Sequence, residues 1–292
     1  MTGSTGPSGE AARPQPPRHP PRVVATDLDG TIIRTDGTVS PRTRRALAAA
    51  EEAGALVVFV TGRPPRWMHP VAEETGHRGL AICANGALVY DLHTETVVEE
   101  HLLQPAAARQ VVQLLRQRIP DVTYAVDRGS SFGHEPEYVA RFPQPDDTLV
   151  VPIDELLRDP AAKLLVRHDT FDADELLARA LEVLGDQVTL THASRDGLIE
   201  VSAAGVSKAT TLSLLCQERG IAADEVLAFG DMPNDLPMLS WAGWGVAVAN
   251  AHPEVLEIAD EVTDSNDDDG VARVVERYFP GDGTQPDDRS YR

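Results

Sequence analysis

Short apolar runs alternate with helical stretches in the first part of the chain. Runs at Val23–Thr26, Leu56–Val60 and Leu80–Cys83 are short, continuously apolar and rich in valine or isoleucine, as buried strands are. A helix is expected between the first two, because Ser40, followed by proline, suits a helix start and Gly54 suits its end. Buried strands separated by helices are typical of a parallel sheet that is covered on both faces.

The pattern changes after residue 86. Residues 87–190 mix strands with two predicted helices, near Ala106–Arg118 and Asp172–Leu184. They also contain a polar segment with proline, glycine and histidine, Asp127–Pro145, which we expect to be a loop. We interpret this part of the chain as a separate inserted module.

Beyond Leu190 the first pattern returns. The expected elements are a helix at Ser207–Arg219, a strand at Val226–Phe229, a helix at Leu236–Trp241, a strand at Gly245–Val248, and helices at Pro253–Ile258 and Gly270–Tyr278. The sequence therefore predicts an α/β fold. A doubly wound, Rossmann-like parallel-sheet core comprises residues 21–86 and 191–280, and an α/β domain of residues 87–190 is inserted into it. Residues 1–20 and 281–292 are rich in proline, glycine and polar residues and are expected to be disordered or flexible tails.

The charge balance and the lack of a long apolar run restrict the function classes. The 26 basic residues face 46 acidic ones, so a formal net charge of −20 repels nucleic acid and anionic membranes. No run approaches the roughly 18 apolar residues of a membrane span, and no secretory signal is evident, so a cytoplasmic protein is expected. Cys83 and Cys216 lack neighbours at metal-ligand spacing and are predicted to be reduced, packed thiols.

Acidic turns follow two of the predicted strands. Ligands bind at the carboxyl ends of the strands in such sheets, which makes these turns candidate site residues. Asp27 and Asp29 leave the same face of an extended chain, and Gly30 then allows a tight turn. An ordinary Asp/Gly turn explains such a motif on its own. Asp231 and Asp235, which follow a later strand, would add two carboxylates to the same rim.

Four carboxylates at one edge of a sheet require a cation. Unit charges about 4 Å apart repel by about 4 kcal/mol at an effective dielectric constant of 20. Carboxylate and carbonyl oxygens without neighbouring histidine or cysteine suit Mg²⁺, which works beside phosphates. The alternative is that Asp231 and Asp235 only start a helix. We prefer the metal site, because a helix start does not explain why both acidic turns follow strands.

Lys208 and the Thr61-Gly62 pair are candidates for holding phosphate. Lys208 lies in the first turn of a predicted helix, where the helix dipole disfavours cations. It is also one of only two lysines, with Lys163, in a chain that otherwise uses arginine. A compact ammonium suits a phosphoryl oxygen, although an exposed helix residue is the simpler alternative. Thr61 offers a hydroxyl and Gly62 a backbone N–H, although Thr-Gly turns are common.

These motifs together resemble a known enzyme superfamily. DLDGT at 27–31, TGR at 61–63, the lone lysine at 208 and GDMPND at 230–235 resemble the haloacid dehalogenase-like (HAD) phosphatases. NGA at 85–87, GVSKATTL at 205–212, VAVANAHPEVLEIAD at 246–260 and TDSNDDDGVA at 263–272 are similar to the Cof-type branch. The large α/β cap of that branch, of subclass IIB, is inserted between the second and third motifs. The resemblance covers roughly residues 22–279.

The resemblance implies a role for each matching residue. Asp27 would be the nucleophile and Asp29 the general acid/base, while Thr61, Gly62 and Lys208 would hold the phosphoryl group. Mg²⁺ would be bound by Asp231 with the Asp27 side chain and the Asp29 carbonyl. Asn234 and Asp235 would support the phosphate, a metal-bound water and Lys208.

The expected reaction is hydrolysis of a small phosphorylated metabolite, such as a sugar phosphate, a nucleotide or a cofactor phosphate. The expected protein is a monomer or a homodimer with no nucleic-acid or membrane partner. Substrate choice would lie in the cap, with Arg128, His134, Glu135 and Arg141 as candidates, unless Asp127–Pro145 is only a surface loop. A phosphomutase, or a phospho-ligand-binding protein without activity, remains an alternative.

Overall fold

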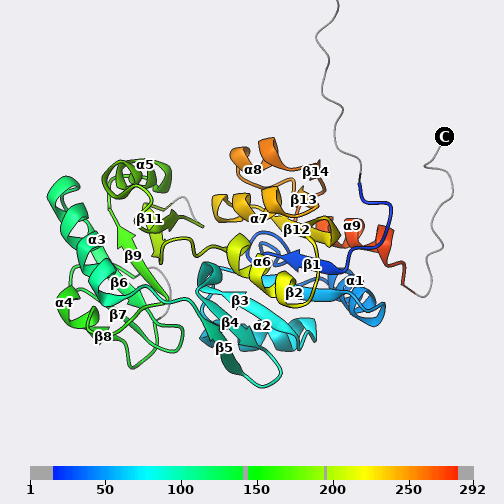
Figure 1. The fold of residues 1–292 in the computed structure, drawn as a ribbon, viewed down its shortest axis with the longest axis horizontal. Helices are drawn as coiled ribbons and strands as arrows, with labels where there is room; N and C mark the ends of the chain where they lie inside the picture. The colour runs from blue at the N-terminus through cyan, green and yellow to red at the C-terminus, as the bar shows by residue number, and fades with distance from the viewer. Residues whose placement is uncertain (1–15, 141–143, 194–195, 282–292) are drawn as a thin grey trace, which may run out of the picture.

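The computed structural model describes residues 16–140, 144–193 and 196–281, which form two sheets (Figure 1). The first sheet has eight strands in the order β14-β13-β12-β1-β2-β3-β4-β5. Its parallel strands are β1 (Val23–Thr26), β2 (Leu56–Val60), β3 (Leu80–Cys83), β12 (Val226–Gly230), β13 (Trp244–Ala247) and β14 (Glu261–Val262). The antiparallel strands β4 (Leu88–Asp91) and β5 (Thr96–Glu100) extend one edge. The predicted α/β class and the doubly wound parallel core are confirmed.

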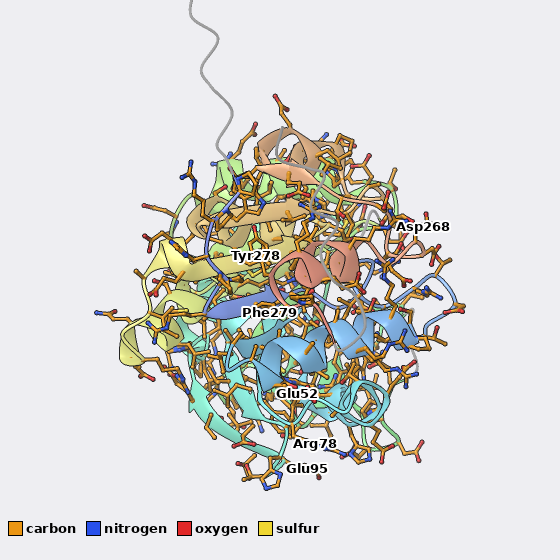
Figure 2. All side chains as sticks on the ribbon, turned by 90° about the vertical axis from the view of Figure 1, so that its right-hand side faces the viewer. Glu52, Arg78, Glu95, Asp268, Tyr278 and Phe279 are labelled. Atoms are coloured by element: carbon orange, nitrogen blue, oxygen red, sulfur yellow. The ribbon has the colours of Figure 1, made fainter. Side chains whose placement is uncertain are left out.

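Helices cover the first sheet. They are α1 (Pro41–Glu52), α2 (Met68–Thr75), α6 (Lys208–Glu218), α7 (Leu236–Trp241), α8 (Pro253–Ile258) and α9 (Gly270–Tyr278). The start of α1 has the predicted cause, because the Ser40 side chain accepts a hydrogen bond from the Thr43 N–H. Figure 2 shows α1 and α9 side by side, on the face of the molecule turned away from the second sheet. Arg42 and Glu276 join these two helices through a 2.9 Å hydrogen bond.

The second sheet has six strands in the order β10-β11-β9-β6-β7-β8. The strands are β6 (Thr123–Asp127), β7 (Phe132–His134), β8 (Leu149–Val150), β9 (Lys163–Arg167), β10 (Thr189–Thr191) and β11 (Leu198–Ser202). Helices α3 (Pro105–Arg118), α4 (Ile153–Leu156) and α5 (Ala173–Leu184) accompany them. A separate apolar core, which includes Leu115, Tyr124 and Ile199, lies within this unit. The unit therefore buries its own hydrophobic surface, as an inserted domain does.

The predicted domain boundaries lie after residues 86 and 190, but the chain passes from one sheet to the other later than this at both places. Residues 88–100 form β4 and β5 of the first sheet, and β11 belongs to the second sheet up to Ser202. We propose boundaries near residues 101 and 203. The predicted loop Asp127–Pro145 also contains β7, because a turn closed by a 3.0 Å bond from the Arg128 N–H to the Ser131 carbonyl folds β7 back on β6.

The carboxyl ends of the central parallel strands face the second sheet. A cavity between the sheets is lined by residues that directly follow β1, β2 and β12 and by residues of β9 and β11. Short 3₁₀ turns, η1 (Pro65–Trp67), η2 (Ala84–Gly86), η3 (Ala223–Glu225) and η4 (Pro233–Asp235), lie in the loops. Arg66 of η1 pairs with Asp127 of β6 at 2.7 Å, which ties the first sheet to the second. In the described ranges, no helix is both long and apolar enough to cross a membrane.

Candidate active site

Three neighbouring strands bring the predicted site residues together. β1 pairs in parallel with both β2 and β12, and Thr26 lies opposite Phe59 and Phe229. The residues that follow these positions, among them Asp27, Thr61 and Asp231, therefore emerge at one edge of the sheet. All three are buried, with at most 7% of any one exposed.

Close contacts hold the loop after β1 against the loop after β12. Gly30 has a φ of +77°, and a Cβ at this position would collide with the carboxylate of Asp231. Thr31 donates a 3.0 Å hydrogen bond from its hydroxyl to Oδ1 of Asp231. From the loop after β13, Asn250 donates a further 2.8 Å bond to the Gly30 carbonyl. The glycine of the Asp-x-Asp-Gly turn is thus required by the close approach of an acidic side chain.

Lys208 lies at the centre of the carboxylates. It is the first residue of α6, it is 1% exposed, and its Nζ donates to Asp27 at 2.5 Å and to Asp235 at 2.7 Å. The Ser207 side chain caps the helix by accepting from the Thr210 N–H, which fixes where the lysine emerges. The simpler alternative, an exposed helix lysine, is wrong.

Asp235 is fully buried, and protein donors occupy both of its oxygens. Oδ1 accepts the hydrogen bond from Lys208, and Oδ2 accepts from the N–H groups of Asp231 and Met232, each at 3.1 Å. The side chain therefore fixes the Asp231 loop and the lysine at the same time.

Burial of several carboxylates around one lysine shifts their protonation. Burial raises the pKa of Asp27 well above its ordinary value, and although Lys208 opposes this shift, the other carboxylates add to it. Burial, together with Asp235, raises the pKa of Asp231 to about 7. Burial alone would lower the pKa of Lys208, but Asp235 and Asp27 outweigh it and raise that pKa. The lysine therefore stays charged. The single ammonium does not balance the negative charge of the surrounding carboxylates, which is why the pKa values of Asp27 and Asp231 remain raised.

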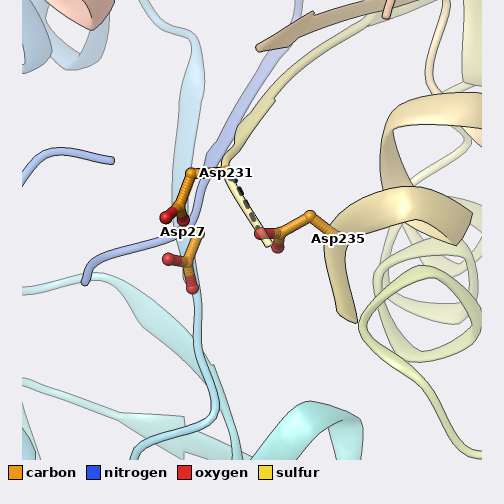
Figure 3. A group of neighbouring side chains, drawn as sticks. All are labelled: Asp27, Asp231 and Asp235. Atoms are coloured by element: carbon orange, nitrogen blue, oxygen red, sulfur yellow. Dashed lines mark hydrogen bonds between the residues drawn. The ribbon is translucent and has the colours of Figure 1, made fainter. Parts of the chain in front are cut away.

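Carboxylate oxygens of Asp27, Asp231 and Asp235 lie within 4.8 Å of one another. Figure 3 shows Asp27 and Asp231 close together, with Asp235 reaching toward them from the α7 side. No other such group of potential ligands occurs in the ranges that the structure describes. Hard oxygen donors with raised pKa values are a donor set that fits a divalent cation.

The side chain of Asp29 lies apart from this group. Its two carboxylate oxygens accept hydrogen bonds from the guanidinium of Arg63, at 2.7 and 2.5 Å, and 57% of the side chain is exposed. The structure thus brings Asp27, Asp231 and Asp235 together, while Asp29 faces the open part of the site.

A cavity of about 530 Å³ adjoins Asp27 and Asp29, a size suited to a small ligand. The predicted residues Thr61, Gly62 and Asn234 line it. Its other lining residues include Arg63, Trp67, Met232 and, from the unit that contains the second sheet, Lys163, Ala193, Leu198 and Glu200. The wall is therefore partly apolar, with charged groups from both sheets.

Three of the four predicted specificity residues lie outside this cavity. Arg128 donates to the Leu156 carbonyl, His134 contacts the Glu135 carbonyl at 2.7 Å, and Glu135 pairs with Arg116. Of the described residues, those that line the cavity include none of these three. Arg141 lies outside the described residues. Arg128, His134 and Glu135 therefore serve contacts within the second sheet's own unit.

Lys163 and Glu200 are the two buried charged residues of the cavity wall that the sequence analysis did not select as site residues. They lie on β9 and β11 and are 5% and 7% exposed. The scarcity of lysine, which distinguished Lys208, applied equally to Lys163 and could have found it. The cysteines are free and buried as predicted, and burial raises the pKa of both thiols.

Comparisons with known proteins identify a family of hydrolases and relatives that are phosphatases. The family described as haloacid dehalogenase-like hydrolase matches residues 24–275. Pyridoxal phosphate phosphatase YbhA of Escherichia coli is 30% identical, over 87% of this chain and 97% of that protein. The 5-amino-6-(5-phospho-D-ribitylamino)uracil phosphatase YcsE of Bacillus subtilis is 28% identical, over 88% of this chain and 95% of its own length.

A solved structure supports the fold as well. BT1666 from Bacteroides thetaiotaomicron, described among phosphatases of the haloalkanoate enzyme superfamily, has a TM-score of 0.76 and 26% identity. The match covers 92% of this chain and 99% of that one. Of the three alternatives that the sequence left open, the comparisons therefore support the phosphatase.

Proposed function

The chain belongs to the haloacid dehalogenase-like hydrolases and is a phosphatase, and we propose that it hydrolyses a small phosphorylated metabolite through an aspartyl-phosphate on Asp27. The observation that carries this proposal is the position of Asp27. Its carboxylate lies against a buried lysine and lines a cavity large enough for such a substrate.

The proposed reaction has two steps on the same aspartate. An oxygen of Asp27 bonds to phosphorus while the bond to the ester oxygen breaks. Asp29, protonated and released from its pair with Arg63, gives its proton to that leaving oxygen. Asp29 then takes a proton from a water, whose oxygen attacks phosphorus and releases Asp27 and inorganic phosphate. Lys208, the Thr61 hydroxyl and the Asn234 amide would bind the phosphoryl oxygens.

We propose that Mg²⁺ binds Asp27, Asp231 and the Asp29 carbonyl, with Asp235 as a support for these groups. When bound, Mg²⁺ supplies positive charge that stabilises the transferring phosphoryl group. Support for this assignment comes from the oxygen-only donor set and from the raised pKa values of Asp27 and Asp231.

The apparent affinity for Mg²⁺ is expected to fall as the pH drops below 7. Because the pKa of Asp231 is raised to about 7, a proton must leave its carboxylate before a cation binds at lower pH. We expect about a tenfold loss of affinity per pH unit below 7 for one displaced proton, measured by isothermal titration calorimetry with MgCl₂. Equal affinities at pH 8 and pH 5.5 would contradict this prediction.

Asp231 also makes the stability of the metal-free protein depend on pH. Its pKa is near 3.9 when unfolded and about 7 when folded, so its contribution to stability is present below pH 4. That contribution is lost as the pH rises through 7. We therefore expect Asp231→Asn to flatten the fall in unfolding temperature between pH 5 and pH 8 in EDTA.

Asp29→Asn is expected to slow the hydrolysis of some substrates much more than of others, depending on whether the leaving group needs a proton. Alkyl phosphates need a proton on the leaving oxygen, so their hydrolysis should slow by about 10²- to 10⁴-fold. p-Nitrophenolate leaves without a proton, and the variant should release about one equivalent in a rapid burst before slow turnover. Stopped-flow absorbance measures the burst, and an equal loss on both substrates without a burst would remove Asp29 from the proposed role.

We further propose that the substrate carries a flat, partly apolar ring. Trp67, Leu198 and Met232 supply an apolar wall to the cavity, against which a ring would pack. The substrates in the names of the two curated relatives, pyridoxal phosphate and a ribitylaminouracil phosphate, both contain a heteroaromatic ring.

A panel of phosphorylated metabolites, with and without Mg²⁺, tests the proposed function through the release of inorganic phosphate. We expect release that depends on Mg²⁺ and is faster for pyridoxal phosphate and flavin mononucleotide than for simple sugar phosphates. If the folded, Mg²⁺-bound protein releases phosphate from no member of the panel, the proposal is wrong. Faster hydrolysis of the sugar phosphates would contradict only the proposal that the substrate carries a flat, partly apolar ring.

A further inference from the structure

Lys163 reaches from the second sheet to the backbone of the loop that follows β2. Its side chain is 6% exposed, and its Nζ donates a 2.8 Å hydrogen bond to the carbonyl of Gly62 and pairs with Glu200. The other oxygen of Glu200 accepts a 2.6 Å bond from Asn85, whose own oxygen accepts from Asn234 at 3.1 Å. A buried polar network thus joins β9 and β11 to the loops that follow β2, β3 and β12.

The Gly62 carbonyl belongs to a peptide group that also touches Thr61. The N–H of the same peptide group, on Arg63, donates a 3.0 Å hydrogen bond to Oγ1 of Thr61. A hydroxyl that accepts through its oxygen still has its own proton to donate. Thr61 is fully buried and lines the cavity beside Asp27, so that proton is available to a phosphoryl oxygen there.

We propose that Lys163 is a positioning residue for phosphate, acting through the Gly62–Arg63 peptide on the hydroxyl of Thr61. The ammonium polarises the peptide carbonyl, which strengthens the bond from the Arg63 N–H to Thr61. That bond orients the hydroxyl and makes it a better donor. The inference rests on the proposed function, because it requires a phosphoryl group at Thr61.

This arrangement links the placement of the second sheet to phosphate binding. The charge of Lys163 reaches Thr61 only when the unit that carries β9 lies over the loop after β2. Arg66 also joins the two sheets, through Asp127, but it makes no hydrogen bond to the Gly62–Arg63 peptide among the described contacts. Loss of the Arg66–Asp127 contact would affect only the docking of the two sheets. Loss of the Lys163–Gly62 contact would also remove the action on Thr61.

A double-mutant cycle tests the proposal. The variants are Lys163→Met, Thr61→Val and the combination, and the measurement is inhibition of p-nitrophenyl phosphate hydrolysis by inorganic phosphate in Mg²⁺. We expect Lys163→Met to weaken phosphate binding by about tenfold, and the combination to be no weaker than Thr61→Val alone. Effects that multiply, or phosphate binding by Lys163→Met equal to that of the wild type, would overturn the proposal.

Three further measurements separate the proposal from a purely structural role. Lys163→Arg keeps a donor for the carbonyl and is expected to restore most of the phosphate affinity. Lys163→Met combined with Glu200→Gln avoids an unpaired buried carboxylate, and its unfolding temperature shows whether the fold is intact. Arg66→Met, the docking control, should give effects that multiply with those of Thr61→Val.

The cycle also separates this inference from the proposed function. A wild type that hydrolyses no phosphomonoester would overturn both. A wild type that is active and inhibited by phosphate, with effects that multiply across the Lys163 and Thr61 variants, would overturn the inference alone.

Discussion

Asp27→Asn is expected to lower phosphatase activity by about 10⁴-fold or more while it stabilises the metal-free protein. An amide oxygen is a poor nucleophile, so the covalent step is lost. The stability gain has a different cause. Burial, with Asp235, Asp231 and Asp29, raises the pKa of Asp27, which means that its charged form is unfavourable in the folded protein.

The two effects are measured separately. Phosphate release gives the activity, and thermal unfolding in EDTA gives the stability, where each 1 kcal/mol corresponds to roughly 2–4 °C. The gain should be largest at pH 8 and should shrink at pH 5, where Asp27 of the wild type is more often protonated. Asp159→Asn, which removes an exposed carboxylate, is the matched control and should change neither quantity. Full activity in Asp27→Asn would show that Asp27 is not the nucleophile.

Much of this site could be predicted because its signals are local in the sequence. Each central strand is a short apolar run, and Ser40 and Ser207 cap helices by hydrogen bonds within their own first turn. Once strands end in acidic turns, the parallel arrangement itself brings Asp27 and Asp231 to one edge. Lys208 stood out because a lysine at a helix start contradicts the helix dipole, and the buried carboxylates explain that contradiction.

The rest depends on contacts between distant segments. β4 and β5 are short strands like those of the inserted unit, and nothing in their residue pattern assigns them to the first sheet. Lys163 and Glu200 reach the site only because the second sheet lies over the strand ends, an orientation that hydrophobic periodicity does not encode. The segment containing Arg128 and Glu135 is polar and close in sequence, yet its side chains are used within its own unit.

Lys208→Met is expected to cause the largest loss of stability, about 3–5 kcal/mol at pH 8 in metal-free protein, together with a loss of activity of at least about a thousandfold. The lysine Nζ donates to Asp27 and Asp235, and both carboxylates are buried, so its removal leaves two buried charges unpaired. The loss should be smaller at pH 5, because the raised pKa of Asp27 lets that carboxylate take up a proton instead.

A second substitution shows whether charge, rather than lost packing, causes this destabilisation. Lys208→Met combined with Asp27→Asn removes the ammonium and one of the two carboxylates that it compensates. If charge is the cause, the double variant should recover much of the stability of the single variant at pH 8 and none of the activity. Urea unfolding with and without EDTA measures the stability. A double variant that is less stable than Lys208→Met would show that the lysine acts mainly by filling space, because removing a charge would then have brought no relief.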